Sequence, residues 1–456
     1  MAGIGFELRK LLRRDNLSSW IRAYAYAGII GSGPWIISIV GLVFVGFMSV
    51  GVVKPDLLVT QFQVSITYLI ALSLILTGLV QLAYTRYIAD RLFEKRHDLV
   101  LPTFMGLLLL TTVVSGVLAL PVAFFLFPET SFMFRLLLMS GFVLLSNVWV
   151  ASVMLTGLKE YKQVLALYAL GYGLAIVSSL VLRPLGTEGL LLGFVIGQLV
   201  LLTGMILIVA HHYPASRLIG FEFRQGLGQY PDLMVIGFLF NLALWADKFI
   251  FWFTPDTSSA IIGPLRASEI YDFPIFLAYL SIIPGMAVFL LRMETDFVEY
   301  YDKFYDAVRN GGSLEYIEEM RNEMVWSARQ GLFEIIKIQS LAVLFYFAIG
   351  PAVLKFFGIS ELYELLLMIM LIGAGLQVVF LGLLNVFFYL DRRRAVLLLV
   401  ALFALLNIGL TLLSIKLGPA WYGYGFAVSL LVVVLLGFFV LDRELDKLEY
   451  RTFMLQ

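Results

Sequence analysis

The chain has 456 residues, of which 61% are hydrophobic and 14% charged, and its 32 lysines and arginines balance its 32 acidic residues. With a mean hydropathy of +0.93, this composition excludes an ordinary soluble globular domain and indicates that lipid surrounds most of the chain. Cysteine is absent, which excludes disulfides, thiolate metal sites and cysteine nucleophiles.

Twelve apolar stretches reach the roughly 20 residues that a helix needs to cross the hydrocarbon layer of a membrane. Helices are expected because they satisfy their own backbone hydrogen bonds where no water is present. We therefore predict an all-α polytopic membrane protein with transmembrane helices near residues 24–52, 59–84, 99–126, 134–156, 164–182, 189–210, 231–253, 272–292, 332–354, 364–390, 395–415 and 421–441.

The connections between these stretches alternate between rich and poor in basic residues. One set, including the N-terminal arm, carries most of them, for example Arg9, Lys10, Arg13, Arg14, Arg22, Arg86, Arg91, Lys95, Arg96, Arg392, Arg393 and Arg394. The other set holds only Lys54, Arg135, Arg183, Arg266, Lys355 and Lys416. Because short basic loops stay in the cytoplasm, we predict a multi-pass protein of the bacterial cytoplasmic (inner) membrane with both termini cytoplasmic. The first apolar run is too long for a cleavable signal peptide.

Six of the predicted helices precede a cytoplasmic linker at residues 211–230 and six follow it. We therefore expect an N-terminal lobe at 1–210 and a C-terminal lobe at 231–456. An even number of spans gives both lobes the same orientation, so any repeat would be parallel, about an axis along the membrane normal. The halves show no strong residue-level match, so this division depends on the span count and the linker position.

The first span contains the helix-breaking run Gly31-Ser32-Gly33-Pro34-Trp35. Proline removes a backbone hydrogen bond and glycine relieves packing, so a kink is expected there. It is either a simple bend or, with Gly31, Gly33 and Pro34, a hinge for alternating access, since transporters place discontinuous helices along the substrate path.

The seventh span places polar residues inside an apolar run: Asn241, Trp245, Asp247 and Lys248. Asp247 and Lys248 are sequence neighbours about 100° apart on a helix, so we expect each to need other partners. The nearest candidates precede or enter the eighth span: Arg266, Glu269 and Asp272. Two interpretations remain open, a buried ion-pair network that fixes the seventh helix and a polar cavity lining in which Asp247 or Glu269 binds a coupling proton or sodium ion.

The longest connection, at 294–330, reads as two amphipathic helices broken by Gly311 and Gly312, with Ser313 as the N-cap of the second. One interpretation is an interfacial helix pair that covers the bundle. The other is a docking surface for a cytoplasmic partner, because its acids outnumber its bases and an anionic leaflet would repel it.

Motifs for chemistry are missing. There is no Walker loop, and His97, His211 and His212 lie in connections without an acid cluster at ligand spacing. We therefore expect no catalytic residue, no cofactor and no metal site, and a protein that is not an enzyme.

Four segments together resemble a known family: the opening at residues 1–12, the 31–35 kink, the Trp245-Ala-Asp-Lys-Phe-Ile-Phe-Trp252 run and the Asp391-Arg-Arg-Arg394 turn. They are similar to the PelG family, the inner-membrane transporters of Pel exopolysaccharide systems, and the resemblance runs end to end. It implies the two-lobed fold of the multidrug/oligosaccharidyl-lipid/polysaccharide flippase superfamily, with six helices in each lobe around a central cavity.

The same resemblance implies passage of an N-acetylgalactosamine-rich polymer across the cytoplasmic membrane for the biofilm matrix, in a complex with PelD, PelE and the cytoplasmic glycosyltransferase PelF. An uncharged acetylated sugar chain is held by stacking and hydrogen bonds, so Trp35, Trp245 and Tyr271 are as plausible in the cavity as the charged residues. The alternatives are a lipid-linked oligosaccharide flippase, a non-transporting scaffold for the glycosyltransferase and, less favoured by the resemblance, a drug or cation antiporter.

Overall fold

The computed structural model describes residues 17–50, 52–157, 161–356, 360 and 363–454. The chain divides into two compact units. Unit 1 comprises Met1–Ser32, Ala246–Ile250 and Glu269–Gln456, and unit 2 comprises Gly33–Trp245 and Phe251–Ser268. The two-lobed, all-α architecture predicted from the sequence is confirmed, and the finer division at 211–230 stays a prediction.

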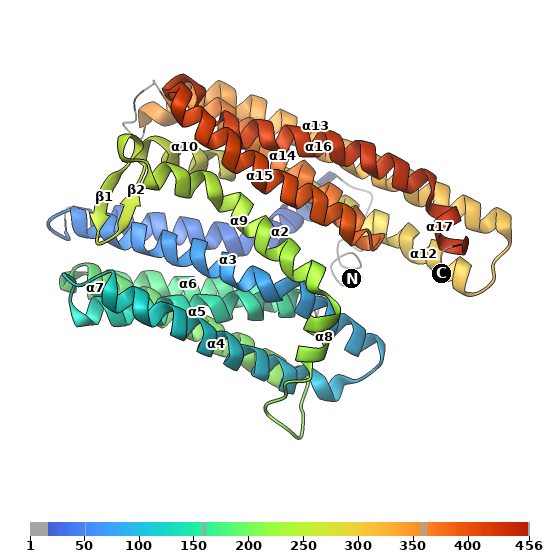
Figure 1. Cartoon of the computed structure of the whole chain (residues 1–456), viewed down its shortest axis with the longest axis horizontal. Coiled ribbons are helices and arrows are strands. Elements are labelled where there is room, and N and C mark those ends of the chain that lie inside the picture. Colours follow the sequence, from blue (N-terminus) through green and yellow to red (C-terminus); the bar gives the residue numbers. More distant parts are fainter. Residues whose placement is uncertain (1–16, 51, 158–160, 357–359, 361–362, 455–456) are drawn as a thin grey trace. The chain divides into compact units, whose positions relative to one another are not determined.

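Unit 2 is built mainly of long helices connected by short loops. Its helices are the second part of α2 (Leu17–Ser49), α3 (Leu57–Phe93), α4 (Val100–Phe125), α5 (Phe132–Gly157), α6 (Tyr161–Leu182), α7 (Thr187–His212), α8 (Phe223–Gln229) and both ends of α9 (Pro231–Phe253). Within it α5 packs on α3, α4 and α7, and α6 on α7 (Figure 1). In the part of unit 2 that the structure describes, three 3₁₀ turns lie in the connections: His97–Leu99, Arg183–Leu185 and Pro255–Thr257.

Two helices of unit 2, α3 and α9, approach each other at glycines. A Cβ atom added to Gly237 would lie 2.2 Å from the carbonyl oxygen of Gly78, and one added to Gly78 would lie 2.6 Å from that of Gly237. No side chain fits between backbones this close, so both positions require glycine.

Unit 1 contains the first part of α2, the middle of α9 and every later α-helix among the described residues. These are α10 (Glu269–Leu280), α11 (Ile283–Leu291), the π-helical segment η4 (Arg292–Phe297), α12 (Val298–Arg309), α13 (Leu314–Phe356), α14 (Glu364–Tyr389), α15 (Arg393–Leu417), a 3₁₀ turn at Pro419–Trp421, α16 (Tyr424–Asp446) and α17 (Leu448–Met454). Its centre is α14, which packs on α10, α13 and α16, while α15 packs on α16.

Among the described residues, eleven helices are long and apolar enough to cross a membrane, and they coincide with the second to twelfth predicted spans. The first predicted span, 24–52, overlaps α2, where the side chains of residues 30–36 lie outside those described. Large apolar side chains such as Val117, Val181, Leu207 and Leu398 remain exposed on these helices, as expected for surfaces that contact lipid.

The eighth span departs from the regular helix expected at 272–292. It breaks at Ser281, because Pro284 in the first turn of α11 has no N–H to continue the ladder. The buried amide of Gln339 in α13 donates to the carbonyl of Ser281, which lies at the break, at 3.1 Å. A long side chain on a neighbouring helix thus stabilises a broken helix at membrane depth.

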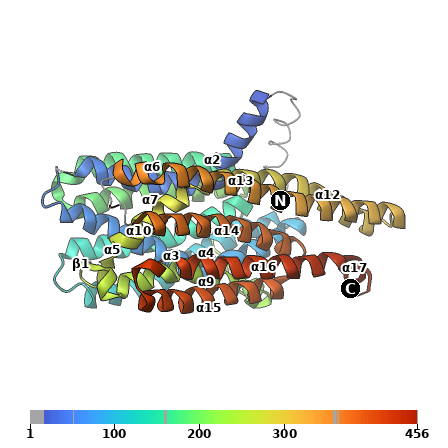
Figure 2. The same ribbon diagram turned by 90° about the horizontal axis from the view of Figure 1, so that it is seen from above.

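The segment at 294–330 forms a helical hairpin of α12 and the first part of α13. Its predicted break is confirmed, since Gly311 has a φ of +66° between α12 and α13. The predicted cap is present as well, because the Tyr316 N–H donates to Ser313 Oγ at 3.3 Å. However, α13 continues without interruption through the ninth predicted span as one 43-residue helix. Figure 2 shows the α12–α13 hairpin projecting past the ends of α14 and α15.

A short β-hairpin, not predicted from the sequence, follows α9 in unit 2. Its strands β1 (Ser259–Ile262) and β2 (Leu265–Ala267) pair antiparallel, and Gly263 in the turn has a φ of +51°. Strands of four and three residues are too short to leave a clear alternating pattern in the sequence.

Candidate functional site

The best-defined polar cluster lies in unit 1, around the middle of α9. Asp247 and Lys248 belong to the short segment Ala246–Ile250, the only part of α9 in that unit. The Lys248 ammonium lies 3.2 Å from Oδ1 and 3.1 Å from Oδ2 of Asp247. Asp247 is 0% exposed and Lys248 4% exposed, so the ion pair is removed from solvent.

The Asp247 carboxylate accepts further hydrogen bonds from two other helices. The Tyr271 hydroxyl of α10 donates to Oδ2 at 2.6 Å, and the Asn407 amide of α15 donates to Oδ1 at 3.4 Å. The Asn407 carbonyl oxygen in turn accepts from the Thr411 hydroxyl at 3.2 Å. Both carboxylate oxygens are therefore satisfied, as a buried charge requires.

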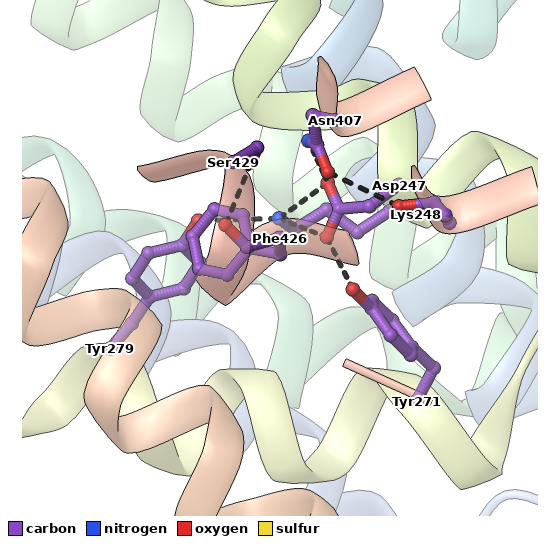
Figure 3. A network of polar contacts seen from close by, with 8 residues as sticks. Asp247, Lys248, Tyr271, Tyr279, Asn407, Phe426 and Ser429 are labelled. Carbon is purple, nitrogen blue, oxygen red and sulfur yellow. Dashed lines mark hydrogen bonds and ion pairs between the residues drawn. The ribbon is translucent and has the colours of Figure 1, made fainter. Parts of the chain in front are cut away.

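The Lys248 ammonium has partners on two more faces. It donates to the Tyr279 hydroxyl at 3.2 Å and lies 5.3 Å from the centre of the Tyr279 ring. It also lies 4.9 Å from the centre of the Phe426 ring, on α16. Aromatic faces attract a cation more strongly when water is excluded. Figure 3 shows side chains from α9, α10, α15 and α16 converging on the pair: Asp247, Lys248, Tyr271, Tyr279, Asn407, Phe426 and Ser429.

Physically, this network fixes one turn of α9 against three helices of unit 1. Burying two charges has a large desolvation cost, and their attraction offsets it only when the remaining donors and acceptors are also paired. Removing one member would leave the other charge buried without compensation, so the cluster holds α9 in one position.

The direct contact between Asp247 and Lys248 was not predicted. Neighbouring residues on a helix point about 100° apart, yet Asp247 and Lys248 do contact each other. The reason is the length of the lysine side chain, whose four methylenes let the ammonium reach back to the preceding carboxylate. The angle between Cα–Cβ bonds does not limit a side chain of that reach.

The predicted partners Arg266, Glu269 and Asp272 have other surroundings. Arg266, on β2 in unit 2, donates to the Trp252 carbonyl at 3.1 Å and to the Ser258 hydroxyl and carbonyl at 2.9 and 2.8 Å. Glu269 is exposed and Asp272 half-buried, both in the first turn of α10. Carboxylates there stabilise the positive end of the helix. The hydrogen-bond partners of the ion pair are instead Tyr271, Tyr279 and Asn407.

Trp245 and Asn241 lie on the part of α9 that belongs to unit 2. The Trp245 ring lies 6.1 Å from that of Trp252, which stacks on Tyr68 of α3 at 4.5 Å. The Asn241 amide donates to the Gly237 carbonyl at 3.0 Å, next to the close approach of α3 and α9. Trp245 is half-buried, so part of its ring remains accessible within unit 2.

The predicted hinge lies in α2, which is helical from Leu17 to Ser49. The surroundings of Gly31, Gly33, Pro34 and Trp35 lie outside what the structure describes. The boundary between the two units falls between Ser32 and Gly33, inside the predicted hinge.

Three contributors to the network were not predicted: Tyr279, Asn407 and Phe426. Asn407 carried a usable signal, because it is an amide inside the apolar run 395–415, where polar residues usually face a bundle interior. Tyr279 and Phe426 carried none, since aromatic residues occur throughout these spans. Among the described residues, no group of three His, Asp or Glu side chains is placed to hold a metal ion.

Solved structures of similar fold are transporters. The chain superimposes on an outward-facing multidrug resistance MATE family transporter of the MOP superfamily (TM-score 0.63, 16% identity, 99% of each chain covered). It also matches a MOP superfamily transporter from Pyrococcus furiosus (TM-score 0.61, 16% identity, 98% of this chain and 99% of that one). A variant of the Vibrio cholerae MATE transporter VcmN gives a TM-score of 0.64 at 14% identity, covering 97% of this chain and 98% of that one. The fold is that of a MOP-type multi-pass membrane transporter.

Within that class, the sequence defines the family. Residues 1–453 match the family described as "PelG: Putative exopolysaccharide Exporter (EPS-E)", so this chain belongs to the PelG family. No curated protein matches the sequence. The resemblance inferred from the N-terminal segment, residues 31–35, the Trp245–Trp252 run and the Asp391–Arg394 turn is confirmed.

Proposed function

We propose that this protein moves the Pel exopolysaccharide, a polymer rich in N-acetylgalactosamine, across the bacterial cytoplasmic membrane while a synthase on the cytoplasmic side extends it. The match to an exopolysaccharide-exporter family over residues 1–453 carries the proposal. The MOP-type transporter fold supports it. In this arrangement both termini are cytoplasmic, as the distribution of basic residues predicts.

The aromatic cluster of unit 2 supports a carbohydrate substrate. Neutral sugars are bound by ring faces and by hydrogen bonds rather than by ion pairs. Trp245, Trp252 and Tyr68 form a continuous aromatic contact there, and Trp245 is partly exposed. Trp245 is therefore the residue of this cluster that we assign to sugar contact.

The buried Asp247–Lys248 network has a supporting role in this proposal. Because both charges are buried and paired, we assign them to holding the middle of α9 within unit 1. Binding of a coupling proton or sodium ion at Asp247 is the competing assignment, and it predicts that export depends on an ion gradient.

For partners, we propose that the α12–α13 hairpin docks the cytoplasmic machinery of the complex, PelF with PelD and PelE. The helical stretches Glu269–Arg309 and Leu314–Lys355 contain 41 and 42 residues, about 60 Å each and roughly twice the hydrocarbon thickness. They therefore extend well beyond the membrane. At the start of α13, Glu315, Glu318 and Glu319 are exposed, and Trp326 further along is 61% exposed. Acids around an exposed aromatic suit a basic protein surface better than an anionic lipid leaflet.

Export is tested with the purified complex in sealed vesicles. Nucleotide sugar is supplied on the cytoplasmic face only, and polymer protected in the lumen is measured with and without a proton gradient. We expect protected polymer with the wild-type protein, and a strong reduction with Trp245→Ala in a variant that still assembles. Dependence on the gradient would favour ion coupling at Asp247, whereas independence would favour export driven by synthesis.

The same assay separates the alternative functions. A lipid-linked oligosaccharide flippase would translocate a finished, carrier-bound repeat unit without the glycosyltransferase. A scaffold would leave polymer outside the lumen even when synthesis is normal, and Trp245→Ala would then have no effect on protected polymer. Either result would contradict the proposed export.

Docking is tested by co-purification. The triple variant Glu315→Gln, Glu318→Gln, Glu319→Gln should lose most of the bound glycosyltransferase, because it removes three charges from one helix face. The matched control is Glu94→Gln with Asp98→Asn, two exposed acids of a different connection that is also predicted to be cytoplasmic. Equal loss in both variants would indicate a general charge effect and contradict docking at the hairpin.

A further inference from the structure

Unit 2 contains a cavity of about 810 Å³ at one end of its helices. Its walls come from the start of α3, the α4–α5 connection, the start of α7 and the β1–β2 turn. The loops among these belong to the connections that are poor in basic residues, so the charge bias places the cavity on the side away from the cytoplasm. Its volume is in the range of small-ligand sites.

Side-chain hydrogen bonds connect these walls. The Thr187 hydroxyl of α7 donates to the Leu58 carbonyl of α3 at 3.0 Å, and the Gln61 amide of α3 donates to the Ile261 carbonyl of β1 at 3.4 Å. The Ser131 hydroxyl donates to the Glu188 carboxylate, joining the α4–α5 connection to α7. Contacts from α3 to α7, from α3 to β1 and from the connection to α7 hold the cavity open in a fixed shape, which limits the ordering cost of binding.

The α4–α5 connection is itself fixed by Arg135. Its guanidinium donates to the carbonyls of Pro128 and Thr130, both at 2.6 Å. Ser131 Oγ also accepts from the Phe134 N–H at 3.0 Å and so caps α5. The loop that forms the cavity rim therefore has its own hydrogen bonds, and Arg135 is engaged by carbonyls of that loop.

The lining combines apolar and polar residues. Phe127 and Phe134 are buried, and the polar residues of the lining are Gln61, Glu129, Thr130, Ser131, Thr187 and Glu188. Of the residues that line it, two are acidic and none is basic. Glu129 is exposed and makes no hydrogen bond or ion pair with any described residue.

This chemistry selects a class of ligand. Carboxylates accept hydrogen bonds from sugar hydroxyls, amide N–H groups and ammonium groups, but two of them repel phosphates and uronic acids. Threonine and glutamine side chains add donors and acceptors, and the exposed leucines of the lining, Leu126 and Leu185, suit the C–H face of a sugar ring. A hydroxyl-rich ligand that is neutral or cationic fits every part of the lining.

We propose that this cavity binds a short segment of a neutral or cationic hexosamine glycan as it emerges on the non-cytoplasmic side, and that it excludes anionic glycans. The inference rests on the proposed function for the identity of the polymer. The binding itself is a property of unit 2 that does not require transport.

The test is binding of oligosaccharides to the full-length protein in lipid nanodiscs, measured by isothermal titration calorimetry. The probes are hexasaccharides of N-acetylgalactosamine, galactosamine and galacturonic acid. We expect the first two to bind and the third not to bind. Glu188→Gln should weaken binding of the galactosamine probe by about tenfold or more, as expected for the loss of a charge-assisted hydrogen bond.

Two further variants distinguish a loss of binding from misfolding of the protein. Glu129→Gln changes an exposed side chain that no described residue contacts by a hydrogen bond, so it should fold normally and still weaken binding of the galactosamine probe. Asp256→Asn removes an exposed acid near the β-hairpin but outside the cavity, and should bind like wild type. Binding of the galacturonic probe at similar affinity, or equal binding by all variants, would overturn the proposal.

A separate measurement tests on which side of the membrane the cavity lies. Because the chain has no cysteine, Thr130→Cys introduces a unique thiol at the rim. A membrane-impermeant maleimide added to intact spheroplasts should label it, and the N-acetylgalactosamine probe should slow the labelling. Labelling only from the cytoplasmic face would overturn the assignment. Export without probe binding would contradict the cavity site alone, whereas probe binding without export would contradict the proposed function alone.

Discussion

At the scale of single residues, we expect substitution of Lys248 to destabilise the fold strongly. Lys248 is nearly fully buried, and its partners are the Asp247 carboxylate, the Tyr279 hydroxyl and two aromatic rings. Asp247 depends on it in turn, because a carboxylate buried in a membrane-spanning lobe has no water to replace a lost cation. The stability contributed by Asp247 and by Lys248 is therefore coupled.

Lys248→Met should destabilise the protein by about 3–5 kcal/mol, because it leaves the buried Asp247 carboxylate without its positive partner. The measurement is the free energy of unfolding in mixed detergent micelles. The double variant Asp247→Asn, Lys248→Met should cost less than the sum of the two single changes, since no uncompensated charge remains. Additive costs would contradict a coupled pair. Asp256→Asn, at an exposed position, serves as the control and should change stability by less than about 0.5 kcal/mol.

Tyr271→Phe should cost about 1.5–3 kcal/mol, because it removes only the hydroxyl that donates to Asp247 at 2.6 Å, a hydrogen bond to a charged group. Tyr84→Phe is the matched comparison. Tyr84 is also buried, but its hydroxyl contacts only the neutral Thr103 hydroxyl, at 3.4 Å, so its loss should cost about 1 kcal/mol or less. Equal costs for the two variants, by the same unfolding measurement, would mean that the charge on Asp247 contributes little.

At the scale of elements, the crossing of α3 and α9 is set by two glycines. Gly237→Ala would place a methyl group 2.2 Å from a backbone oxygen of α3, so the helices must separate. We expect a large loss of folded protein, measured by the monodisperse fraction in size-exclusion chromatography and by the unfolding midpoint. Gly116→Ala in α4 is the control, because nothing lies within 4 Å of the added Cβ. There the change should stabilise the helix by up to about 1 kcal/mol.

The transmembrane helices could be predicted from the sequence, but the contacts between them could not. Long apolar runs fix the spans, because each helix satisfies its own backbone and its length is set by the membrane. Apolar run length did not locate the break at Ser281, although Pro284 marks it locally, and the side chain that stabilises it, Gln339, lies 58 residues further along the chain. Likewise, Asn407 lies 160 residues from Asp247. Contacts between residues so far apart in sequence depend on how the helices pack, and no local sequence pattern predicts which helices will be neighbours.

For the site, too, the residues inside a span could be predicted but their contacts with other helices could not. Asp247 and Lys248 were predicted because polar groups inside a span stand out against an apolar background, whereas Tyr271 was named as an aromatic residue that could stack on a sugar. Arg266, Glu269 and Asp272 were named as candidate partners because they are close in sequence, whereas Tyr271, Tyr279 and Asn407 donate to or accept from the pair in the structure. The cavity of unit 2 had no signal at all, because its rim comes from four separate connections and helix ends.

At the scale of the whole molecule, the chain passes between its two units at four places: after Ser32, Trp245, Ile250 and Ser268. The first lies inside a helix, at a Gly-Ser-Gly-Pro run that weakens the backbone hydrogen-bond ladder. A transporter that cycles between conformations needs such hinge residues, which absorb dihedral changes far from the substrate. A polymer path that stays in one conformation does not need them.

The triple variant Gly31→Ala, Gly33→Ala, Pro34→Ala tests which of these applies. It should favour a regular helix and leave the unfolding midpoint unchanged or higher. If export requires cycling, protected polymer in the vesicle assay should fall by about tenfold or more, equivalent to about 1.4 kcal/mol on the barrier. The control, Gly116→Ala with Pro121→Ala, makes the same two kinds of substitution in α4, which lies within unit 2, and should leave export unchanged. Full export by the triple variant would contradict hinge motion in α2 and favour a polymer driven through by its own synthesis.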